Sequence, residues 1–437
     1  MNVLTAASIW LMLSFTPYLH FPPTPLTESV DNDLSYLEAF YKERHEHPEI
    51  SLEEKETAAR LTSELRQLGI EVTENFGGYG IVGILKNGNG PTILYRTDMD
   101  ALPMYEKTGL PYASQKTITY NGDKTGAMHS CGHDMHMTAW LGTARQMVKL
   151  KNQWKGTLML IGQPAEEIGA GAKLMLDAGL YEKFGEPKYG IALHCSPTIP
   201  AGKMGYGKGF TMASSESIDI KVFGVGAHGA APHMSVDPIV IASMMVMELQ
   251  TIVSRSLKPT DPAVITVGAI KGGTKHNIIP DEVTLKLTVR TFSDDVRAKI
   301  HQRIKEIARG VAIAAGMPED RMPEVHIPDT KGLANWNDGL LVDKLTRSAA
   351  TVIGAHQVTE AEPQMVSEDF ALYGQYKVKI PTVLYWLGTV PAERMAKGDL
   401  PGLHSPYYYP DVKASLRTGV SVTTQSLLDL FNEKQGQ

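Results

Sequence analysis

A short run of residues near position 130 carries the side chains that most often bind metals in proteins. The run is His129-Ser130-Cys131-Gly132-His133-Asp134-Met135-His136. About thirty residues later the chain has two adjacent carboxylates, Glu166 and Glu167. A thiolate and imidazoles can hold a divalent ion, while a spare carboxylate handles protons. The residue types and their spacing therefore indicate a hydrolytic metal site.

Cys131 and His133 are the strongest candidate ligands within this run. They would lie in the loop that enters a helix expected over residues 134–150, whose first residue is a suitable N-cap. The positive end of the helix dipole favours thiolate over thiol at such a position. His129 and His136 are alternative ligands, and both rank below His133.

The carboxylate pair follows a buried strand expected over residues 157–162. Adjacent carboxylates in a loop point in different directions, so one can bind metal while the other faces the metal-bound water. A solvated acidic loop is the alternative. His194 follows another expected strand, residues 189–193, which would deliver it to the same sheet edge.

Asp98 and Asp100 follow a third strand, expected over residues 92–97. Acidic residues at the carboxyl end of a central strand lie where open α/β sheets have their active sites. One of the two carboxylates would orient a ligating imidazole through a hydrogen bond. A turn with Asx capping is the alternative.

Cys131 and Cys195 are the two cysteines of the chain. In an exported protein a disulfide between them is conceivable, and it would remove the thiolate from the metal. Because such a bridge would dismantle the ligand cluster, we expect instead that Cys195 is a small buried apolar residue.

Four motifs, taken in order, resemble a known family. They are Arg-Thr-Asp-Met-Asp-Ala-Leu-Pro at 96–103, His-Ser-Cys-Gly-His-Asp-Met-His at 129–136, Gln-Pro-Ala-Glu-Glu at 163–167 and Ala-Leu-His at 192–194. Together they look like the amidohydrolase branch of the dinuclear aminoacylase/carboxypeptidase metallopeptidase family. That branch includes hippurate hydrolases, auxin-conjugate hydrolases and N-acetyl-diaminopimelate deacetylases. The resemblance runs from about residue 34 to the C-terminus.

The resemblance implies two divalent metal ions. Their ligands in this sequence would be Cys131, His133, Glu167, His194 and His404. Glu166 would be the general base and acid. By composition alone, His404 would be read as a surface histidine. Sulfur and imidazole suit zinc, but the carboxylate admits manganese, cobalt or nickel, and this branch is similar to manganese- or nickel-activated enzymes.

The resemblance also assigns three residues to the substrate. It makes His228 a donor to the carbonyl oxygen of the scissile amide, from the same subunit or from the partner subunit. It places Asn277 and Arg290 at the substrate carboxylate, where the planar fork of an arginine can donate two parallel hydrogen bonds. From the residues alone, His228 could be structural in a turn, and Arg290 could pair with a neighbouring acid.

The pattern of elements predicts an α/β protein in two parts. Residues 34–212 and 329–437 would form a catalytic domain with a central mixed sheet flanked by helices. Residues 213–328 would form an inserted two-layer α+β domain, with two helices on one side of an antiparallel sheet. Such an insert resembles the family's lid, which often forms the dimer contact, so we expect a homodimer or a higher homo-oligomer.

Three other features of the expected catalytic domain can be explained by structural roles rather than by metal binding. Residues 34–68 predict two helices divided by Pro48, and the charged run 53–56 is expected on a solvated helix face. His45 is expected at the surface or in packing. Residues 367–370, Ser-Glu-Asp-Phe, are expected either to cap a helix or to lie near the site.

Length and charge exclude some classes of protein. A chain of 437 residues is too long for one ordinary core, which favours two domains. Its net charge of −6, without basic clusters, gives no electrostatic footprint for nucleic acid. The expected partner is a small-molecule substrate, an N-acyl amino acid.

The N-terminus carries an incomplete targeting signal. Residues 4–16 are an apolar run too short to span a bilayer but long enough for a signal-peptide core. Pro22, Pro23 and Pro25 then predict an extended linker, so that residues 1–33 would be leader and linker. Export to the periplasm or medium is expected, with a cytoplasmic location and a disordered leader as the alternative. No later segment resembles a membrane span.

The sequence therefore predicts a metal-dependent amidohydrolase that cleaves the amide bond of N-acyl amino acids such as hippurate. A metallo-dipeptidase or carboxypeptidase on the same fold is the alternative. A metal-free binding protein is a weaker alternative, because it would require lost ligands and none is lost.

Overall fold

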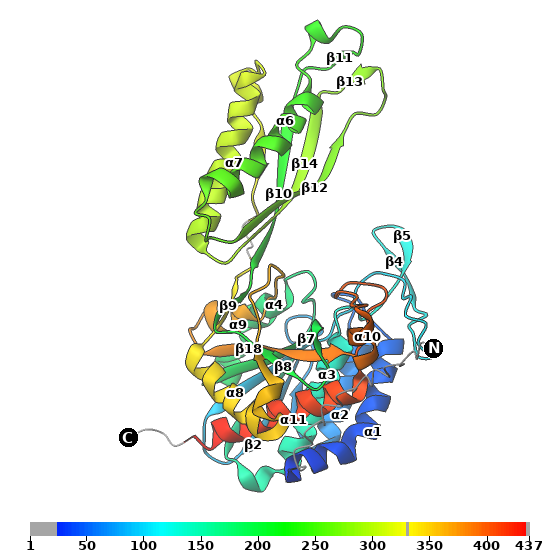
Figure 1. Cartoon of the computed structure of the whole chain (residues 1–437), viewed down its shortest axis with the longest axis vertical. Coiled ribbons are helices and arrows are strands. Elements are labelled where there is room, and N and C mark those ends of the chain that lie inside the picture. The colour runs from blue at the N-terminus through cyan, green and yellow to red at the C-terminus, as the bar shows by residue number, and fades with distance from the viewer. Residues whose placement is uncertain (1–23, 329–331, 434–437) are drawn as a thin grey trace, which may run out of the picture.

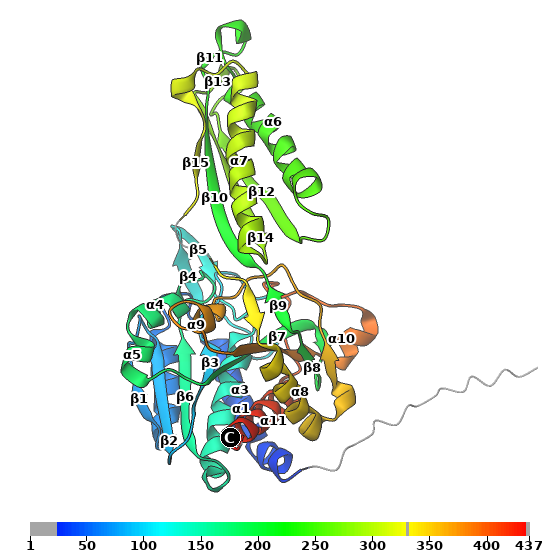
Figure 2. The same ribbon diagram turned by 90° about the vertical axis from the view of Figure 1, so that its left-hand side faces the viewer.

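The computed structural model describes residues 24–328 and 332–433. These residues form a larger body and an elongated insert that projects from it (Figure 1). Figure 2, turned by 90°, shows the same separation. The expected signal-peptide core, residues 4–16, lies outside the described residues.

The larger body is organised around an eight-stranded mixed sheet. In spatial order the strands are β1 (Glu71–Thr73), β2 (Ile81–Asn87), β6 (Gly156–Gln163), β3 (Thr92–Asp98), β7 (Tyr189–Pro200), β18 (Thr382–Val390), β8 (Met204–Tyr206) and β17 (Val358–Glu360). The four central strands β6, β3, β7 and β18 run parallel to one another. They are buried almost throughout, as parallel strands covered on both faces must be. Their carboxyl ends therefore meet at one edge of the sheet.

Helices cover both faces of this sheet. One core lies under the helices α1 (Pro25–Glu46), α2 (Lys55–Gln67), α3 (His133–Lys149), α8 (Gly339–Ile353) and α11 (Val412–Phe431). The opposite core lies under the shorter helices α4 (Gly171–Asp177), α5 (Leu180–Phe184) and α9 (Ala371–Gln375). The arrangement confirms the predicted α/β class with a central mixed sheet flanked by helices.

Smaller elements complete the larger body. They are the hairpin β4 (Thr117–Tyr120) and β5 (Asp123–Gly126), the pair β9 (Gly209–Met212) and β16 (Asn335–Asn337), and the helix α10 (Ala392–Lys397). The β9–β16 pair lies beside the two points where the chain enters and leaves the insert (Figure 1).

Two predicted boundaries are wrong. Helix α1 begins at Pro25, well before the expected start of folded structure, because Thr24 accepts a hydrogen bond from the Thr27 amide at 3.1 Å and Pro25 occupies the first helical position. Helix α3 begins at His133 rather than at residue 134. Its N-cap is Gly132, whose left-handed φ of 83° turns the chain into the helix.

The insert has its own sheet and core. Its antiparallel sheet has the order β12 (Ala263–Gly272), β14 (Glu282–Thr291), β10 (Ser214–Phe223), β15 (Glu324–His326). Helices α6 (Pro238–Thr251) and α7 (Asp294–Ala314) pack on one face of it. A short pair, β11 (Ala227–His228) and β13 (Ile278–Ile279), forms the tip farthest from the larger body in both views.

Helix α6 is unusually apolar on its outer surface. Helix α6 and the helical turn after it form the segment Pro238–Ser256. Its most apolar stretch of 18 residues has a mean hydropathy of 1.3, and 28% of that stretch is buried. By length and composition such a helix could cross a membrane, but one such helix is weak evidence for a span. It is the only candidate among the described residues.

Candidate metal centre

Five side chains from four parts of the chain meet at the carboxyl edge of the large sheet. Cys131 and His133 flank Gly132, the N-cap of α3, and Glu167 follows β6. His194 lies within β7, and His404 lies in the loop between α10 and α11. Within this set, Cys131, His133 and His194 form one group whose ligand atoms all lie within 4.8 Å of one another. Cys131, Glu167 and His404 form a second such group, so the thiol is common to both.

Cys131 and His194 face each other in the buried part of the site. The Cys131 Sγ lies 3.6 Å from the His194 Nε2. The other ring nitrogen, Nδ1, is 2.9 Å from the Cys195 carbonyl oxygen and can donate to it. This hydrogen bond fixes the tautomer and leaves Nε2 free to bind a cation.

His133 is prepared in the same way. Its Nδ1 lies 2.7 Å from the Asp100 carbonyl oxygen, so this nitrogen carries the proton. Its Nε2 is buried without a hydrogen-bond partner among the described residues. That nitrogen lies 3.8 Å from a carboxylate oxygen of Glu166 and 3.8 Å from one of Glu167. An unpartnered buried nitrogen next to two carboxylates suits a metal ligand.

Glu167 and His404 form the more exposed half of the site. The His404 Nε2 is 3.3 Å from the Glu167 Oε2, and the Glu167 Oε1 is buried without a partner among the described residues. His404 has a left-handed φ of 63°, which is strained for a residue other than glycine. Its amide donates to the Ser130 carbonyl oxygen at 2.9 Å, which ties the loop to the ligand run.

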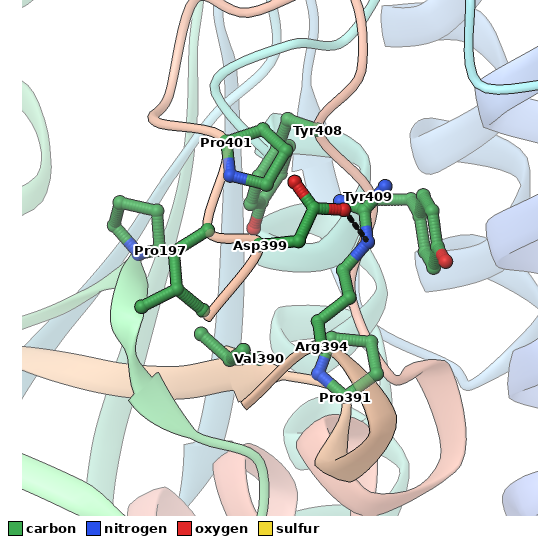
Figure 3. Close-up of a pocket in the computed structure, with 9 residues that line it drawn as sticks. Pro197, Val390, Pro391, Arg394, Asp399, Pro401, Tyr408 and Tyr409 are labelled. Carbon is green, nitrogen blue, oxygen red and sulfur yellow. Dashed lines mark ion pairs between the residues drawn. The ribbon is translucent and has the colours of Figure 1, made fainter. Parts of the chain in front are cut away.

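Arg394 braces the loop that carries His404. Its guanidinium donates to the Tyr407 carbonyl oxygen at 2.9 Å and lies 3.8 Å from the centre of the Tyr409 ring. Figure 3 shows this arginine between Asp399 and Tyr409, beside a small pocket behind the loop. The loop is therefore held by contacts on both sides of His404.

Asp98 and Asp100 lie under the ligands. Asp98 accepts from the His136 Nδ1 at 2.7 Å, while the His136 Nε2 accepts the Cys195 amide at 2.8 Å. Both ring nitrogens of His136 are thus engaged within the protein. Asp100 accepts the Glu167 amide at 2.9 Å and, through its carbonyl oxygen, orients His133. Both acids hold parts of the site in place.

His129, the other alternative ligand, lies apart from the ligand groups found among the described residues. Its ring is buried, and neither ring nitrogen has a hydrogen-bond partner there. Burial lowers the pKa of His129 to about 4, so the ring is neutral near pH 7. We therefore assign it no role in holding a cation.

The charges of the site favour a bound cation. Burial, followed by the carboxylates of Glu167 and Glu166, raises the pKa of Cys131 well above its ordinary value. Without a cation, burial and these carboxylates therefore outweigh the helix dipole expected to favour the thiolate. A cation would reverse this shift, because a coordinating thiol is deprotonated by the ion. Sulfur, nitrogen and oxygen donors with orphaned buried atoms fit a pair of divalent ions.

Glu166 lies in a buried acidic cluster with Glu368 and Asp369. Burial, then Glu368 and Glu167, raise its pKa well above the usual range of a glutamate. The residues expected to begin a helix, 367–370, instead place Glu368 and Asp369 before α9. There they accept hydrogen bonds from the buried Arg96 at 2.8 and 3.1 Å. The segment lies next to the site.

The residues assigned to the substrate are spread over the insert. His228 and Asn277 are exposed and belong to its tip, around β11 and β13 (Figure 1). The His228 Nδ1 accepts the Ala230 amide at 3.0 Å. Arg290 lies near the C-terminal end of β14, at the end of the insert that is next to the larger body rather than at the tip (Figure 1). Burial, then the charges of His133 and Arg290, lower the pKa of His404.

Both cysteines are free and buried, as expected. Two other buried groups are His45, expected at the surface or in packing, and Glu54, expected on a solvated face. His45 is 2.6 Å from Asp134 and 3.1 Å from Glu106, and although burial opposes protonation, these partners raise the pKa of His45 to about 10. Glu54 is fully buried, so the solvated face expected for residues 53–56 is wrong at this position. A charged run at helical spacing carries no signal of such burial.

Comparisons with known proteins agree with this geometry. The model of peptidase family M20/M25/M40 matches residues 94–429. The chain is 34% identical over 350 residues to N-acetylcysteine deacetylase of Bacillus subtilis, covering 80% of this chain and 87% of that protein. It is 38% identical over 335 residues to hippurate hydrolase of Campylobacter jejuni, covering 76% and 83%.

A solved structure shares the fold. The dinuclear metal-binding peptidase of the M20 family from Bacillus subtilis superposes with a TM-score of 0.75 at 29% identity. The match covers 92% of this chain and 99% of that one. Body and insert are therefore both included in the likeness.

Proposed function

The chain belongs to peptidase family M20/M25/M40 and is a metal-dependent hydrolase of amide or peptide bonds, and we propose that it cleaves the amide bond of N-acyl amino acids. The observation that carries the proposal is the pair of ligand groups sharing Cys131 at the sheet edge. Two relatives that match most of the chain are named for the hydrolysis of hippurate and the deacetylation of N-acetylcysteine, which are both N-acyl amino acids.

The site would hold two divalent cations. Cys131 would contribute to both, with His133 and His194 on the buried side and Glu167 and His404 on the exposed side. Manganese, zinc, nickel and cobalt all accept such mixed ligands. Bound cations would polarise the amide carbonyl and lower the pKa of a water molecule.

Glu166 would carry the proton. It would accept a proton from the attacking water and return it to the nitrogen of the leaving amine. Its position supports this role, because it lies beside His133 but belongs to neither group that shares Cys131.

Arg290 and Asn277 would bind the carboxylate of the substrate. Arg290 is half-buried, burial lowers the pKa of its guanidinium, and its charge acts on His404. A substrate carboxylate would restore charge balance around this arginine. Asn277 lies at the tip of the insert, away from Arg290 of its own chain (Figure 1), so it would join the arginine from the insert of a second copy.

His228 would donate to the oxyanion from the partner subunit. Its tip lies away from the larger body of its own chain in both views (Figures 1 and 2), which supports a donor that crosses between subunits. A donor aimed at the developing negative charge stabilises the transition state.

The insert also offers a surface for such a dimer. The outer side of α6 exposes a row of large apolar side chains, namely Ile239, Val240, Met244 and Met247. Next to it β12 is an edge strand of the insert sheet. An exposed apolar helix beside an open edge favours pairing with a second copy.

Hydrolysis assays with metal-reconstituted protein test the proposal. Metal-free protein would be reloaded with manganese, zinc, nickel or cobalt, and N-benzoylglycine would be compared with dipeptides of the same leaving amino acid. We expect at least one metal to support hydrolysis of the N-acyl amino acid with the higher kcat/KM. Glu166→Gln should keep its metal and lose about 10²- to 10⁴-fold in kcat. A wild-type rate in that variant would show that the base is misassigned.

A dipeptidase or carboxypeptidase is the second candidate, because the family model is that of peptidases. A preference for dipeptides in the same assay would favour it.

The location of the protein is a separate proposal, namely export guided by residues 4–16. N-terminal sequencing of the mature protein would test export, and an intact leader would contradict it.

A further inference from the structure

Glu54 is a fully buried carboxylate in the turn between α1 and α2. Its Oε1 accepts two backbone hydrogen bonds, from the Ala165 amide at 2.7 Å and from the Leu52 amide at 3.0 Å. Its Oε2 is buried without a partner among the described residues. Although Glu54 precedes α2, its side chain makes no capping hydrogen bond to that helix. This buried carboxylate therefore accepts its hydrogen bonds from two loops rather than from the helix.

Both donors have strained backbones. Leu52 has a φ of 68° and Ala165 a φ of 52°, in the left-handed region that residues other than glycine rarely adopt. Such conformations persist only where the surroundings enforce them, and they gather at functional sites. One oxygen of Glu54 therefore holds two left-handed residues at once.

Ala165 immediately precedes Glu166 and Glu167. Its backbone angles set the direction in which the chain leaves β6, and hence where the two carboxylates point. The Ala165 carbonyl also accepts the amides of Ala170 and Gly171, both at 3.1 Å, which closes the loop. A shift at this residue would move both acids of the site together.

The same turn reaches the neighbouring loop of the site. Ser51 donates to the Asp100 Oδ2 at 2.6 Å, and the same oxygen accepts the Glu167 amide at 2.9 Å. The Glu49 carbonyl oxygen accepts the Ala101 amide at 2.7 Å. Residues 49–54 therefore contact the loops after β3 and after β6, which present the site.

We propose that Glu54 is a positioning residue, whose Oε1 holds Ala165 in its left-handed conformation and thereby aims Glu166 and Glu167. The inference rests on the proposed function of that carboxylate pair. Glu54 itself belongs to none of the candidate ligand groups found among the described residues.

Glu49 provides a matched control in the same turn. It is also a buried glutamate, but its carboxylate accepts the amides of Glu56 and Thr57, at 3.3 and 2.7 Å, and so holds the start of α2. Glu49→Ala removes a buried carboxylate without removing the bond to Ala165. It separates a loss of local stability from a misplacement of Glu166 and Glu167.

The test compares Glu54→Ala, Glu54→Gln and Glu49→Ala in the metal-loaded full chain, with kcat, KM and thermal midpoint measured at saturating metal. Glutamine keeps an oxygen in reach of both amides, so E54Q should keep kcat within about threefold of wild type. E54A should lose about 100-fold in kcat with little change in KM, because a small misplacement of reacting groups is costly. E49A should lower the thermal midpoint and keep kcat within about threefold.

Ala165→Gly adds a second readout. Glycine adopts positive φ without strain, so a left-handed turn at residue 165 depends less on its hydrogen bond to Glu54. The double variant E54A/A165G should regain about tenfold in kcat over E54A. If E54A does not fold, Glu54→Asp replaces it, since a side chain shorter by one methylene cannot reach the amide of Ala165 and should show the same loss.

Three results would overturn the inference: E54A or E54D with kcat near wild type, E54Q as damaged as E54A, or a double variant with no recovery. Failure of the proposed function gives a different result, in which Glu166→Gln itself turns over at the wild-type rate. The two failures are therefore distinguishable in one set of assays.

Discussion

The residues assigned to chemistry lie in two regions of the molecule that differ in how they are built. At the edge of the large sheet, ligand atoms from four parts of the chain lie within 4.8 Å of one another in groups of three. At the tip of the insert, His228 and Asn277 are exposed and lie far from that edge in both views. One region is assembled within a single chain. In the proposed function, the other acts only when it meets the site of a second subunit.

The difference follows from the two sheets. Parallel strands such as β3, β6 and β7 deliver the residues after them to one edge, so the fold itself brings the ligands together. The insert is an antiparallel sheet whose strands carry β11 and β13 outward, away from the body. We infer that the centre binds metal in each subunit and that the tip serves the site of a partner.

Removal of a buried ligand should have the largest effect on this comparison. His194→Ala removes the nitrogen that faces Cys131, so metal content should fall and kcat/KM should drop by about 10³-fold or more. Elemental analysis of the purified variant and steady-state assays would measure both. His129→Ala is the matched control, since that buried ring lies outside the ligand groups and its loss should leave metal content unchanged. The reverse pattern would break the account of the centre.

His45→Ala should destabilise the region behind the centre. It leaves the carboxylates of Asp134 and Glu106 buried without their cation, at a cost of about 3–5 kcal/mol in the free energy of unfolding. Urea unfolding would measure this loss. The tip, which contains no such buried pair among its described residues, should tolerate His228→Ala with an unchanged free energy of unfolding.

The contribution of His45 should depend on pH in a defined direction. Its pKa of about 10 in the folded protein lies above the ordinary value of about 6.5 in the unfolded chain. Its stabilisation is therefore complete below about pH 6.5 and is lost as the pH rises through about 10. The gap in unfolding free energy between wild type and His45→Ala should shrink over that window. A gap that widens would contradict the buried imidazolium.

His228→Ala should lower kcat by about 10²-fold and leave metal content intact, because it removes an oxyanion donor but no ligand. Mixing this variant with Glu166→Gln sharpens the comparison. If the tip serves the partner, a mixed dimer contains one site with both Glu166 and His228, and activity returns after subunit exchange. Two inactive variants that stay inactive after proven exchange would place the donor within one chain.

Arg290→Lys should have the smallest effect, about a tenfold rise in KM, because lysine keeps the charge but loses the planar fork. The expected rise is confined to substrates with a free carboxylate. An N-acyl amino acid amide, which lacks that carboxylate, should show the same KM with both proteins. An equal rise for the amide would mean that Arg290 supports the site in another way.

The sequence predicts the centre better than its surroundings. The apolar runs of β3 and β6 and the ligand types at Cys131 and His133 are local signals, so the sheet edge and its chemistry can be inferred from them. His404 carries no such signal, since its loop approaches through a strained backbone and the Ser130 carbonyl. It could be assigned only through resemblance to a family.

The missed residues share a physical cause. Glu54 lies in a charged run that suits a solvated helix, and its burial depends on contacts with Ala165, more than a hundred residues away in the sequence. Helix α1 starts early because of a cap at Thr24 that a proline-rich segment conceals. The position of His228 depends on the length and direction of the insert, which periodicity does not encode.

The central claim is that Cys131 is shared by two cations bound with His133 and His194 on one side and Glu167 and His404 on the other. Anomalous X-ray diffraction from crystals of the full chain loaded with manganese or zinc tests it most directly. The account predicts two anomalous peaks per subunit, both within bonding distance of the Cys131 sulfur. Peaks elsewhere in the chain, or a single peak with His404 and Glu167 left unbound, would contradict it.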